Sequence, residues 1–317
     1  MFAPTPDFPA RVEGGLLGLL AADALGVPYE FHSPRDIPPR AQIEYAPPPG
    51  YDRAHSGTPP GTWSDDGAMA LALLVSLLER GKLDPDDLAR RFLAWRDEGA
   101  YAVDGRVFDI GVQTGAALSA IKRGVPPLEA GPTEERALGN GSLMRVLPLT
   151  LWSKDSDATL IADAMMQSRL THGHPRAQVC CALYSLWARR ALEEHPDPWG
   201  SATATLRELW PDSSPERAEL EFSIRPDDAP EGQGRGYVVD TLRSARWAIE
   251  TTGGYEDAVR AAIALGHDTD TTACVAGGVA GLRYGVAGIP ARWRDALRGQ
   301  DVLAPLRDAL LAWRQAG

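Results

Sequence analysis

The stretch GHDTDTTACVAGGVAG, residues 266–281, joins a polar turn to a run of small residues. The small residues predict a helix over 270–284 that can pack very close to its neighbours, because little side-chain volume separates it from them. These small positions are Ala273, Ala276, Gly277, Gly278 and Gly281.

The polar turn contains a cluster of oxygen-bearing side chains: Asp268, Asp270 and Thr271. A second cluster of the same kind stands before the apolar run of GTWSDDGAMA, residues 61–70: Ser64, Asp65 and Asp66. Each cluster alone is typical of a helix N-cap. Together they supply four carboxylates and two hydroxyls, which suits a pair of hard divalent cations such as Mg²⁺ or Mn²⁺. Four buried carboxylates without cations would be very costly.

The rest of the chain also predicts helices. Asp84 as N-cap, Pro85 at the first helical position and Gly99 at the end define one clear case. Another runs over 11–25 and stops at Gly26, for which we expect the left-handed conformation of a helix C-terminus. Further helices are expected near 66–80, 112–123, 156–170, 175–194, 237–251, 255–265 and 301–315. Two stretches rich in proline and glycine, 34–62 and 196–236, predict irregular loops. The pattern favours one all-α domain over 1–317.

Composition sets the broad class of the protein. The 317 residues are 44% hydrophobic and 24% charged, which is typical of a globular protein. A net charge of -11 argues against a broad surface for nucleic acid or anionic lipid. Three irregularly spaced cysteines give neither a disulfide framework nor a zinc site, and no run is long enough to span a membrane. We therefore expect a cytoplasmic protein.

Several motifs occur in an order that is similar to that of the ADP-ribosylglycohydrolases. They are ADALGVPYEF, GTWSDDGAM, FDIG, GNGSLMR, THGHP, GYVVDTL and GHDTDTTACVAGGVAGLRYG. FDIG and GYVVDTL resemble the bacterial dinitrogenase reductase-activating branch of that family. The resemblance covers about residues 11–285.

The resemblance implies an orthogonal all-helical fold with two magnesium or manganese ions in a cleft, where the bond between ADP-ribose and a modified side chain is hydrolysed. It puts metal ligands at Ser64, Asp65, Asp66, Asp268, Asp270 and Thr271. It implies catalytic carboxylates at Glu30 and Asp109. Ligand contacts are implied at Gly139, Asn140, Gly141, Ser142, His172 and Tyr237. The implied partner is an ADP-ribosylated protein or small molecule, with ADP-ribose as product.

The residues leave other interpretations open. Glu30 could be a surface acid, Asp109 could cap a helix that begins near Ile110, and Tyr237 could be a core aromatic. Val112 stands where relatives often have a polar residue, which bears on the acceptor. Arginine-linked ADP-ribose is the first expectation, followed by serine-linked, nucleic-acid-linked and O-acetylated forms. A structural or binding-only relative and a phosphohydrolase that cuts the pyrophosphate are the remaining alternatives.

Overall fold

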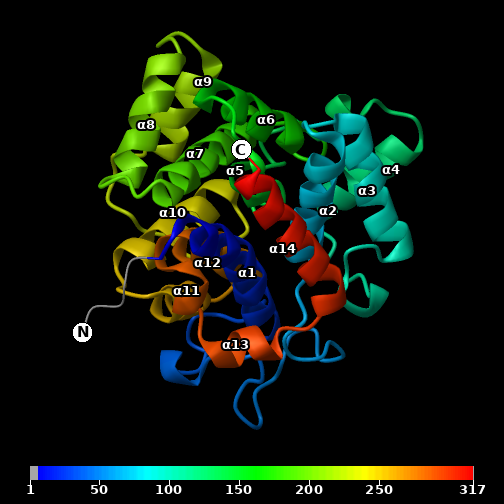
Figure 1. Ribbon diagram of the computed structural model, residues 1–317, viewed down its shortest axis with the longest axis vertical. Helices are drawn as coiled ribbons and strands as arrows, with labels where there is room; N and C mark the ends of the chain where they lie inside the picture. Colours follow the sequence, from blue (N-terminus) through cyan, green and yellow to red (C-terminus); the bar gives the residue numbers. More distant parts are fainter. Residues whose placement is uncertain (1–5, 317) are drawn as a thin grey trace.

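The computed structural model describes residues 6–316, which fold into a single all-α domain (Figure 1). The first half contains α1 (Phe8–Gly26), α2 (Asp65–Arg80), α3 (Pro85–Glu98), α4 (Val112–Lys122), α5 (Leu147–Trp152) and α6 (Asp157–Arg169). The second half contains α7 (Pro175–Leu192), α8 (Pro198–Leu209), α9 (Pro215–Ala218), α10 (Val238–Glu250), α11 (Tyr255–Ile263), α12 (Thr269–Gly288), α13 (Ala291–Ala296) and α14 (Gln300–Gln315). Within the described residues, pairing of extended backbone is limited to one isolated bridge between Gly139 and Tyr237.

Helices α1 and α12 lie side by side through the middle of the molecule (Figure 1). Glycines make this contact possible, since a Cβ atom on Gly281 would lie 1.9 Å from the backbone oxygen of Gly14. A Cβ atom on Gly277 would lie 2.5 Å from the oxygen of Gly18. Both distances are shorter than any real contact, so the close packing predicted for the small-residue helix is confirmed.

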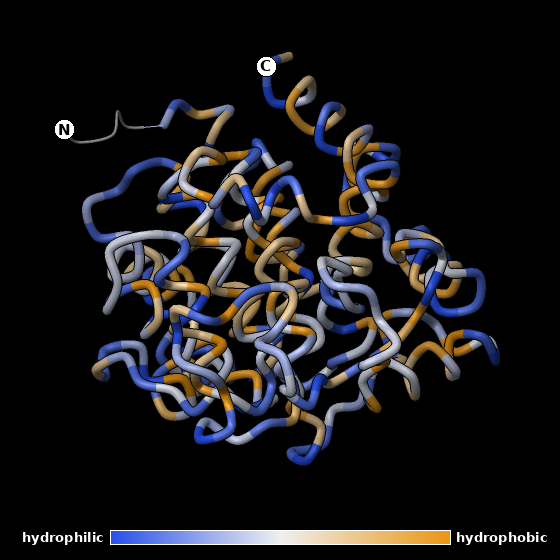
Figure 2. Tube along the Cα trace, turned by 90° about the horizontal axis from the view of Figure 1, so that it is seen from below, coloured by the Kyte–Doolittle hydropathy of each residue, from blue (hydrophilic) through white to orange (hydrophobic). Residues whose placement is uncertain are grey.

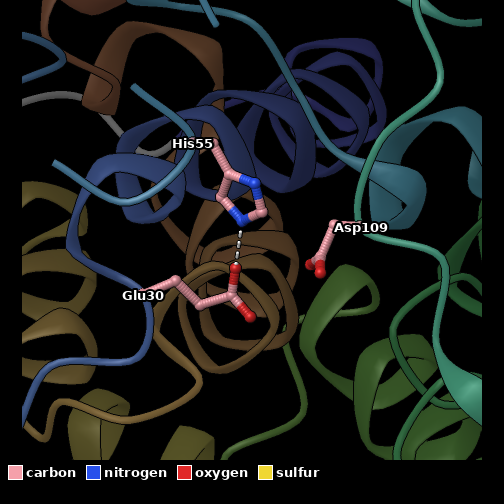
Figure 3. Close-up of side chains that lie close together, drawn as sticks. All are labelled: Glu30, His55 and Asp109. Atoms are coloured by element: carbon pink, nitrogen blue, oxygen red, sulfur yellow. Dashed lines mark hydrogen bonds and ion pairs between the residues drawn. The ribbon is translucent and has the colours of Figure 1, made fainter. Parts of the chain in front are cut away.

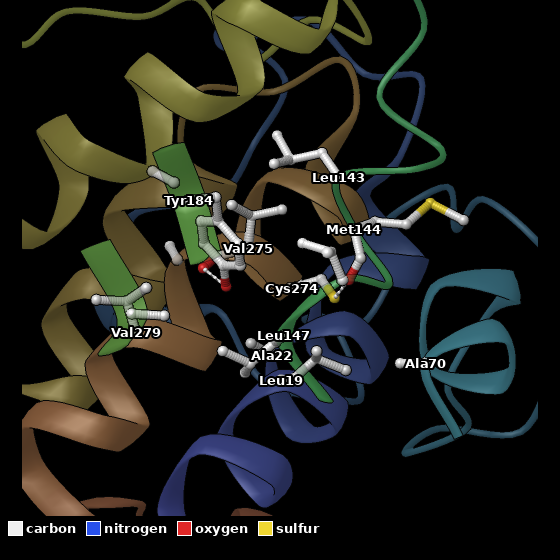
Figure 4. Close-up of a cluster of buried hydrophobic side chains, with 14 of the residues drawn as sticks. Leu19, Ala22, Ala70, Leu143, Met144, Leu147, Tyr184, Cys274, Val275 and Val279 are labelled. Carbon is white, nitrogen blue, oxygen red and sulfur yellow. Dashed lines mark hydrogen bonds between the residues drawn. The ribbon is translucent and has the colours of Figure 1, made fainter. Parts of the chain in front are cut away.

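The hydrophobic core surrounds this helix pair. Figure 4 shows Leu19 and Ala22 of α1 together with Cys274 and Val275 of α12, all of them buried. The hydroxyl of Tyr184, from α7, donates a 3.0 Å hydrogen bond to the backbone oxygen of Val275. In the view of Figure 2, hydrophilic stretches follow the loops at the edge of the molecule and hydrophobic stretches lie farther inside. Between residues 6 and 316, no helix combines the length and the apolar character that a membrane span requires.

Gly26 differs from its prediction. Its φ of -74° and ψ of -34° are right-handed, and the chain continues into a 3-10 helix over Val27–Tyr29. Glycine is required at this position because the backbone of α12 passes so close to it. A Cβ atom on residue 26 would lie 2.4 Å from the Cα atom of Asp270. The end of α1 therefore sits directly on the first turn of α12.

The segment 196–236 was predicted to be irregular, and this is wrong for most of its length, which contains α8, α9 and a π-helical stretch over Glu219–Ile224. Asp197 accepts a 2.9 Å hydrogen bond from the backbone N–H of Gly200, and Pro198 occupies the first turn, so α8 has an ordinary N-terminus. Trp199, Ala202 and Leu206 then bury one face of α8. Proline and glycine were interpreted as helix breakers, whereas here they stand at a helix start. The segment 34–62 is irregular as predicted, apart from a 3-10 turn at Arg40–Gln42.

Candidate metal and substrate cleft

The two predicted oxygen clusters meet at the N-termini of α2 and α12. Ser64 is the N-cap of α2, and its hydroxyl accepts a 3.3 Å hydrogen bond from the backbone N–H of Asp66. Asp268 is the N-cap residue of α12. The hydroxyl of Thr271 donates to Oδ1 of Asp66 at 3.5 Å, which joins the two clusters directly. Helix starts far apart in sequence thus place their acidic residues in one location.

A cleft of about 220 Å³ opens over these helix ends. Its walls contain most of the predicted site residues. They come from the first turns of α2, α4 and α12 and from the α1–α2, α3–α4, α4–α5 and α6–α7 connections. The lining residues are Glu30, Asp65, Asp66, Asp109, Gly111, Val112, Gln113, Thr114, Gly139, Asn140, Gly141, Met144, His172, Asp268 and Thr271.

The carboxylates below this cleft are buried and crowded. Burial, and next the charges of neighbouring carboxylates, raise the pKa of Asp65, Asp66 and Asp270 well above the usual range. Oδ2 of Asp66 and Oδ2 of Asp270 are buried and have no hydrogen-bond partner among the described residues. Carboxylate oxygens of Glu30, Asp268 and Asp270 lie within 4.8 Å of one another. Unpartnered buried oxygens in such a group have the composition of a divalent-cation site.

Glu30 follows the 3-10 helix at the end of α1 and is 5% exposed, so it is no surface acid. Burial, and next the charge of Asp109, raise the pKa of Glu30 to about 10. The Glu30 carboxyl therefore holds a proton readily in this environment. Figure 3 shows Glu30 and Asp109 reaching into the same space from separate segments.

Asp109 does not act as a helix cap. Helix α4 begins at Val112 with Gly111 as its N-cap residue, and no side chain caps it. Asp109 itself has a left-handed φ of 56°, a conformation that is uncommon for a residue with a side chain. Carboxylate oxygens of Glu30 and Asp109 and a ring nitrogen of His55 lie within 4.8 Å of one another. A second acid in the loop before Asp109, Asp104, is exposed and pairs with Arg298.

The GNGS loop and His172 form another part of the cleft. Asn140 donates hydrogen bonds to Oδ2 of Asp268 at 2.8 Å and to the Thr241 hydroxyl at 2.9 Å. Gly141 lies against His172, since a Cβ atom on this glycine would be 2.8 Å from Cε1 of the imidazole. Burial, and next the charge of Arg145, lower the pKa of His172 to about 3, so this imidazole is neutral.

Two predicted ligand-contact residues have other surroundings. The Ser142 side chain is buried in the core, where its Oγ accepts a 2.8 Å hydrogen bond from Ser168. Tyr237 is 38% exposed, and its hydroxyl accepts a 3.4 Å hydrogen bond from Arg176. Tyr237 borders a neighbouring cavity of about 430 Å³, although its backbone pairs with Gly139 in the loop of the cleft.

Sequence reasoning missed two residues of the site. Asp23 lies inside the apolar helix α1, fully buried, and accepts hydrogen bonds from the backbone N–H groups of Ser64 and Gly67. His55 lies in the loop over 34–62, with Nε2 2.6 Å from Oε2 of Glu30. Asp23 could have been recognised from the sequence, because it is an acidic residue in the middle of an apolar stretch of the predicted helix. His55 has no local pattern that distinguishes it.

The model of the ADP-ribosylglycohydrolase family matches residues 4–316. ADP-ribosylarginine hydrolase Tri1 of Pseudomonas putida is 33% identical over 89% of this chain and 73% of its own length. ADP-ribosyl-[dinitrogen reductase] glycohydrolase of Rhodospirillum rubrum is 29% identical over 97% of both chains. A solved structure described as an ADP-ribosylglycohydrolase-related protein complex superposes with a TM-score of 0.76, at 33% identity, over 96% of this chain and 98% of the other. The chain therefore belongs to the ADP-ribosylglycohydrolase family of hydrolases.

Proposed function

We propose that the protein removes ADP-ribose from arginine side chains of modified proteins, with the help of two divalent cations. Two relatives at 31% and 33% identity are named ADP-ribosylarginine hydrolases, and this supports arginine as the acceptor. The observation that carries the proposal is the position of Asp109, whose carboxyl stands in the cleft wall near Glu30.

Asp109 suits a guanidinium leaving group. A guanidinium is planar and cationic, and a carboxylate can accept two parallel hydrogen bonds from it. The strained backbone of Asp109 supports this role, because an uncommon φ persists where the surrounding structure holds a side chain in one direction. Asp109 would thus bind the arginine side of the scissile bond.

Six residues fit the two cations: Ser64, Asp65, Asp66, Asp268, Asp270 and Thr271. The unpartnered oxygens of Asp66 and Asp270 are the observation that favours metal binding here. When bound, Mg²⁺ or Mn²⁺ would supply positive charge and Lewis-acid chemistry at the ribose hydroxyls. The Asn140 amide, which donates to Asp268, would keep that carboxylate in position.

Glu30 and the GNGS loop complete the proposed reaction. The bond between the anomeric carbon of ribose and the guanidine nitrogen breaks, while a water oxygen bonds to that carbon and a proton from this water ends on arginine. Glu30 is suited to hold and transfer that proton, because its carboxyl is buried in the wall of the cleft and is hydrogen-bonded to His55. Gly139 and Gly141 line the cleft, and we assign to their loop the contact with the pyrophosphate.

Product analysis by mass spectrometry tests the proposal directly. The purified protein, with Mg²⁺ or Mn²⁺, is incubated with ADP-ribosylated arginine, serine and nucleic-acid substrates and with O-acetyl-ADP-ribose. We expect intact ADP-ribose and unmodified arginine as the main products. Faster turnover of another linkage would replace the arginine assignment. AMP with a ribose phosphate would indicate pyrophosphate cleavage, and binding without any product would indicate a non-catalytic relative.

We also propose that the protein is cytoplasmic. The state of its cysteines supports a reducing compartment of this kind. Cys180, Cys181 and Cys274 are all free and buried. Burial raises the pKa of each of these thiols, so they are unreactive core residues.

A further inference from the structure

His55 contacts one candidate catalytic carboxyl and lies next to the other. Its Nε2 is 2.6 Å from Oε2 of Glu30, and the two side chains are only 16% and 7% exposed. Figure 3 shows the imidazole pointing at Glu30 while the Asp109 carboxyl faces the same space. This histidine comes from a proline- and glycine-rich loop that has no regular structure around it.

The loop is attached to the backbone on both sides of the cleft. The N–H of Ala54 donates a 3.1 Å hydrogen bond to the oxygen of Pro28, two residues before Glu30. On the other side, the guanidinium of Arg106, three residues before Asp109, donates to the oxygen of Gly57. His55 therefore lies between two anchors, one on each catalytic segment.

Two aromatic rings hold the imidazole in place. The ring of Phe31, which follows Glu30, lies 5.5 Å from the imidazole, measured between ring centroids. The ring of Phe108, which precedes Asp109, lies 5.1 Å away. His55 also has a left-handed φ of 48°, an uncommon conformation that the hydrogen bond from Thr58 N–H to its backbone oxygen, 2.7 Å long, helps to hold.

A glutamate in such a cleft needs this kind of support. Its side chain has several rotatable bonds, and one carboxylate oxygen must be fixed if the other is to face the substrate in a single orientation. Carboxylate oxygens of Asp109, Asp268 and Asp270 also lie within 4.8 Å of a Glu30 oxygen, so this carboxyl has alternative groups toward which it can turn. An N–H at Nε2 of the imidazole can donate a hydrogen bond to Oε2 and hold this oxygen in place.

We propose that His55 is a positioning residue that holds the Glu30 carboxyl, through the hydrogen bond between Nε2 and Oε2, in its productive orientation. This inference rests on the proposed hydrolysis of an ADP-ribosyl bond. The loop over 34–62 would then be part of the active site, because it carries the group that orients the catalytic acid.

The test compares His55→Ala, His55→Gln and the control His195→Ala in kinetics with ADP-ribosyl-arginine. His195 is an exposed histidine of the α7–α8 connection and borders a separate cavity. We expect His55→Ala to lower kcat about 10- to 100-fold with little change in KM, because a misplaced catalytic group loses rate more than binding. His55→Gln should recover part of the rate, since its amide N–H can replace Nε2. His195→Ala should behave like the parent protein.

Mn²⁺ titration and crystal structures of the same variants give results that do not depend on turnover. We expect unchanged Mn²⁺ stoichiometry and a reoriented Glu30 side chain in His55→Ala. The proposal is overturned if kcat stays at the parent value, if only KM rises, or if one Mn²⁺ site is lost, which would make His55 a metal ligand. A parent protein that hydrolyses no ADP-ribosyl substrate would instead reject the proposed function, and the Glu30 orientation would still test the contact.

Discussion

Oδ2 of Asp23, inside α1, accepts a 2.8 Å hydrogen bond from the backbone N–H of Gly67 in the first turn of α2. Both oxygens of the same carboxylate also accept from the N–H of Ser64, at 3.0 and 3.1 Å. Burial raises the pKa of Asp23 to about 7, although these hydrogen bonds act in the opposite direction. A side chain of α1 thus satisfies backbone N–H groups at the start of α2, next to the N-cap residue Ser64, and this turn carries Asp65 and Asp66.

We expect Asp23→Ala to lower the free energy of unfolding by about 2 to 5 kcal/mol, because two buried N–H groups lose their acceptor. The Mn²⁺ affinity should fall as well, since the turn that holds Asp65 and Asp66 loosens. Urea unfolding and calorimetry measure the two effects. Asp86→Ala, at an exposed position of α3, is the control and should stay within about 0.5 kcal/mol of the parent. If Asp23→Ala were as stable as Asp86→Ala, the hydrogen bonds of Asp23 to α2 would not contribute to stability.

The contact between α1 and α12 predicts that Gly281→Ala is severely destabilising. The new methyl group would overlap the backbone oxygen of Gly14, which cannot move without separating the helices. We expect a loss of more than about 3 kcal/mol in urea unfolding, or no folded protein. Gly253→Ala is the matched control, because a Cβ atom there meets nothing within 4 Å. A Gly281 variant as stable as this control would contradict the observed helix contact.

Substitutions of the buried carboxylates should weaken metal binding, and one of them should at the same time stabilise the metal-free protein. Asp65→Ala and Asp270→Ala should each remove most of the activity and weaken Mn²⁺ binding in calorimetry. With a chelator present, Asp270→Asn should be more stable than the parent, because one of several crowded carboxylates becomes neutral. Chelation should also stop turnover under conditions in which the parent remains folded. An Asp270→Asn variant that binds Mn²⁺ normally would place the cations elsewhere.

Asp109→Asn tests recognition of the acceptor. We expect slower hydrolysis of ADP-ribosyl-arginine, by about 10- to 100-fold, because the amide loses the charge-assisted hydrogen bond to the guanidinium. The affinity for free ADP-ribose should remain near that of the parent. Asp104→Asn, at an exposed residue of the same loop, serves as the control. Normal arginine turnover with weakened ADP-ribose binding would move Asp109 to the nucleotide side.

His172 predicts a specific pH dependence of stability. Its pKa is about 3 in the folded protein and about 6.5 when unfolded, so the unfolded chain binds the extra proton between these values. The folded state therefore loses stability as the pH falls below about 6.5. Between pH 7 and pH 5 this contribution amounts to about 2 kcal/mol.

The substitution His172→Asn should remove the part of the acid sensitivity that comes from the imidazole. Urea unfolding of parent and variant at pH 7 and pH 5 gives the difference, and the parent should lose about 2 kcal/mol more than the variant. Parallel losses in the two proteins would mean that other groups account for the acid sensitivity.

The sequence predicted most helices because their signals are local. The helix of 84–99 has its N-cap, first-turn proline and terminal glycine in order, and it forms as Pro85–Glu98. The two acidic clusters were recognisable for a similar reason, since each stands before an apolar helical run. The helix α8 was missed because its proline and glycine are helix breakers on average but stand at a capped N-terminus here.

The residues that were missed at the site act across long sequence separations. The partners of Asp23 lie on another helix, and the partners of His55 lie on two other segments. Nothing in the neighbouring residues indicates such contacts. The same holds for Ser142, whose hydroxyl bonds to the core residue Ser168 although it stands in a glycine loop of the cleft.

The central helix pair also affects how the chain acquires its structure during synthesis. Helix α1 (Phe8–Gly26) leaves the ribosome long before α12 (Thr269–Gly288), which covers its glycine face. At about 5 to 20 residues per second, α1 waits on the order of tens of seconds for its partner. During that interval the glycine face of α1 lacks its partner helix, and uncovered apolar surface of this kind favours binding by chaperones. Fragments that end before α12 lack both this partner and half of the acidic site.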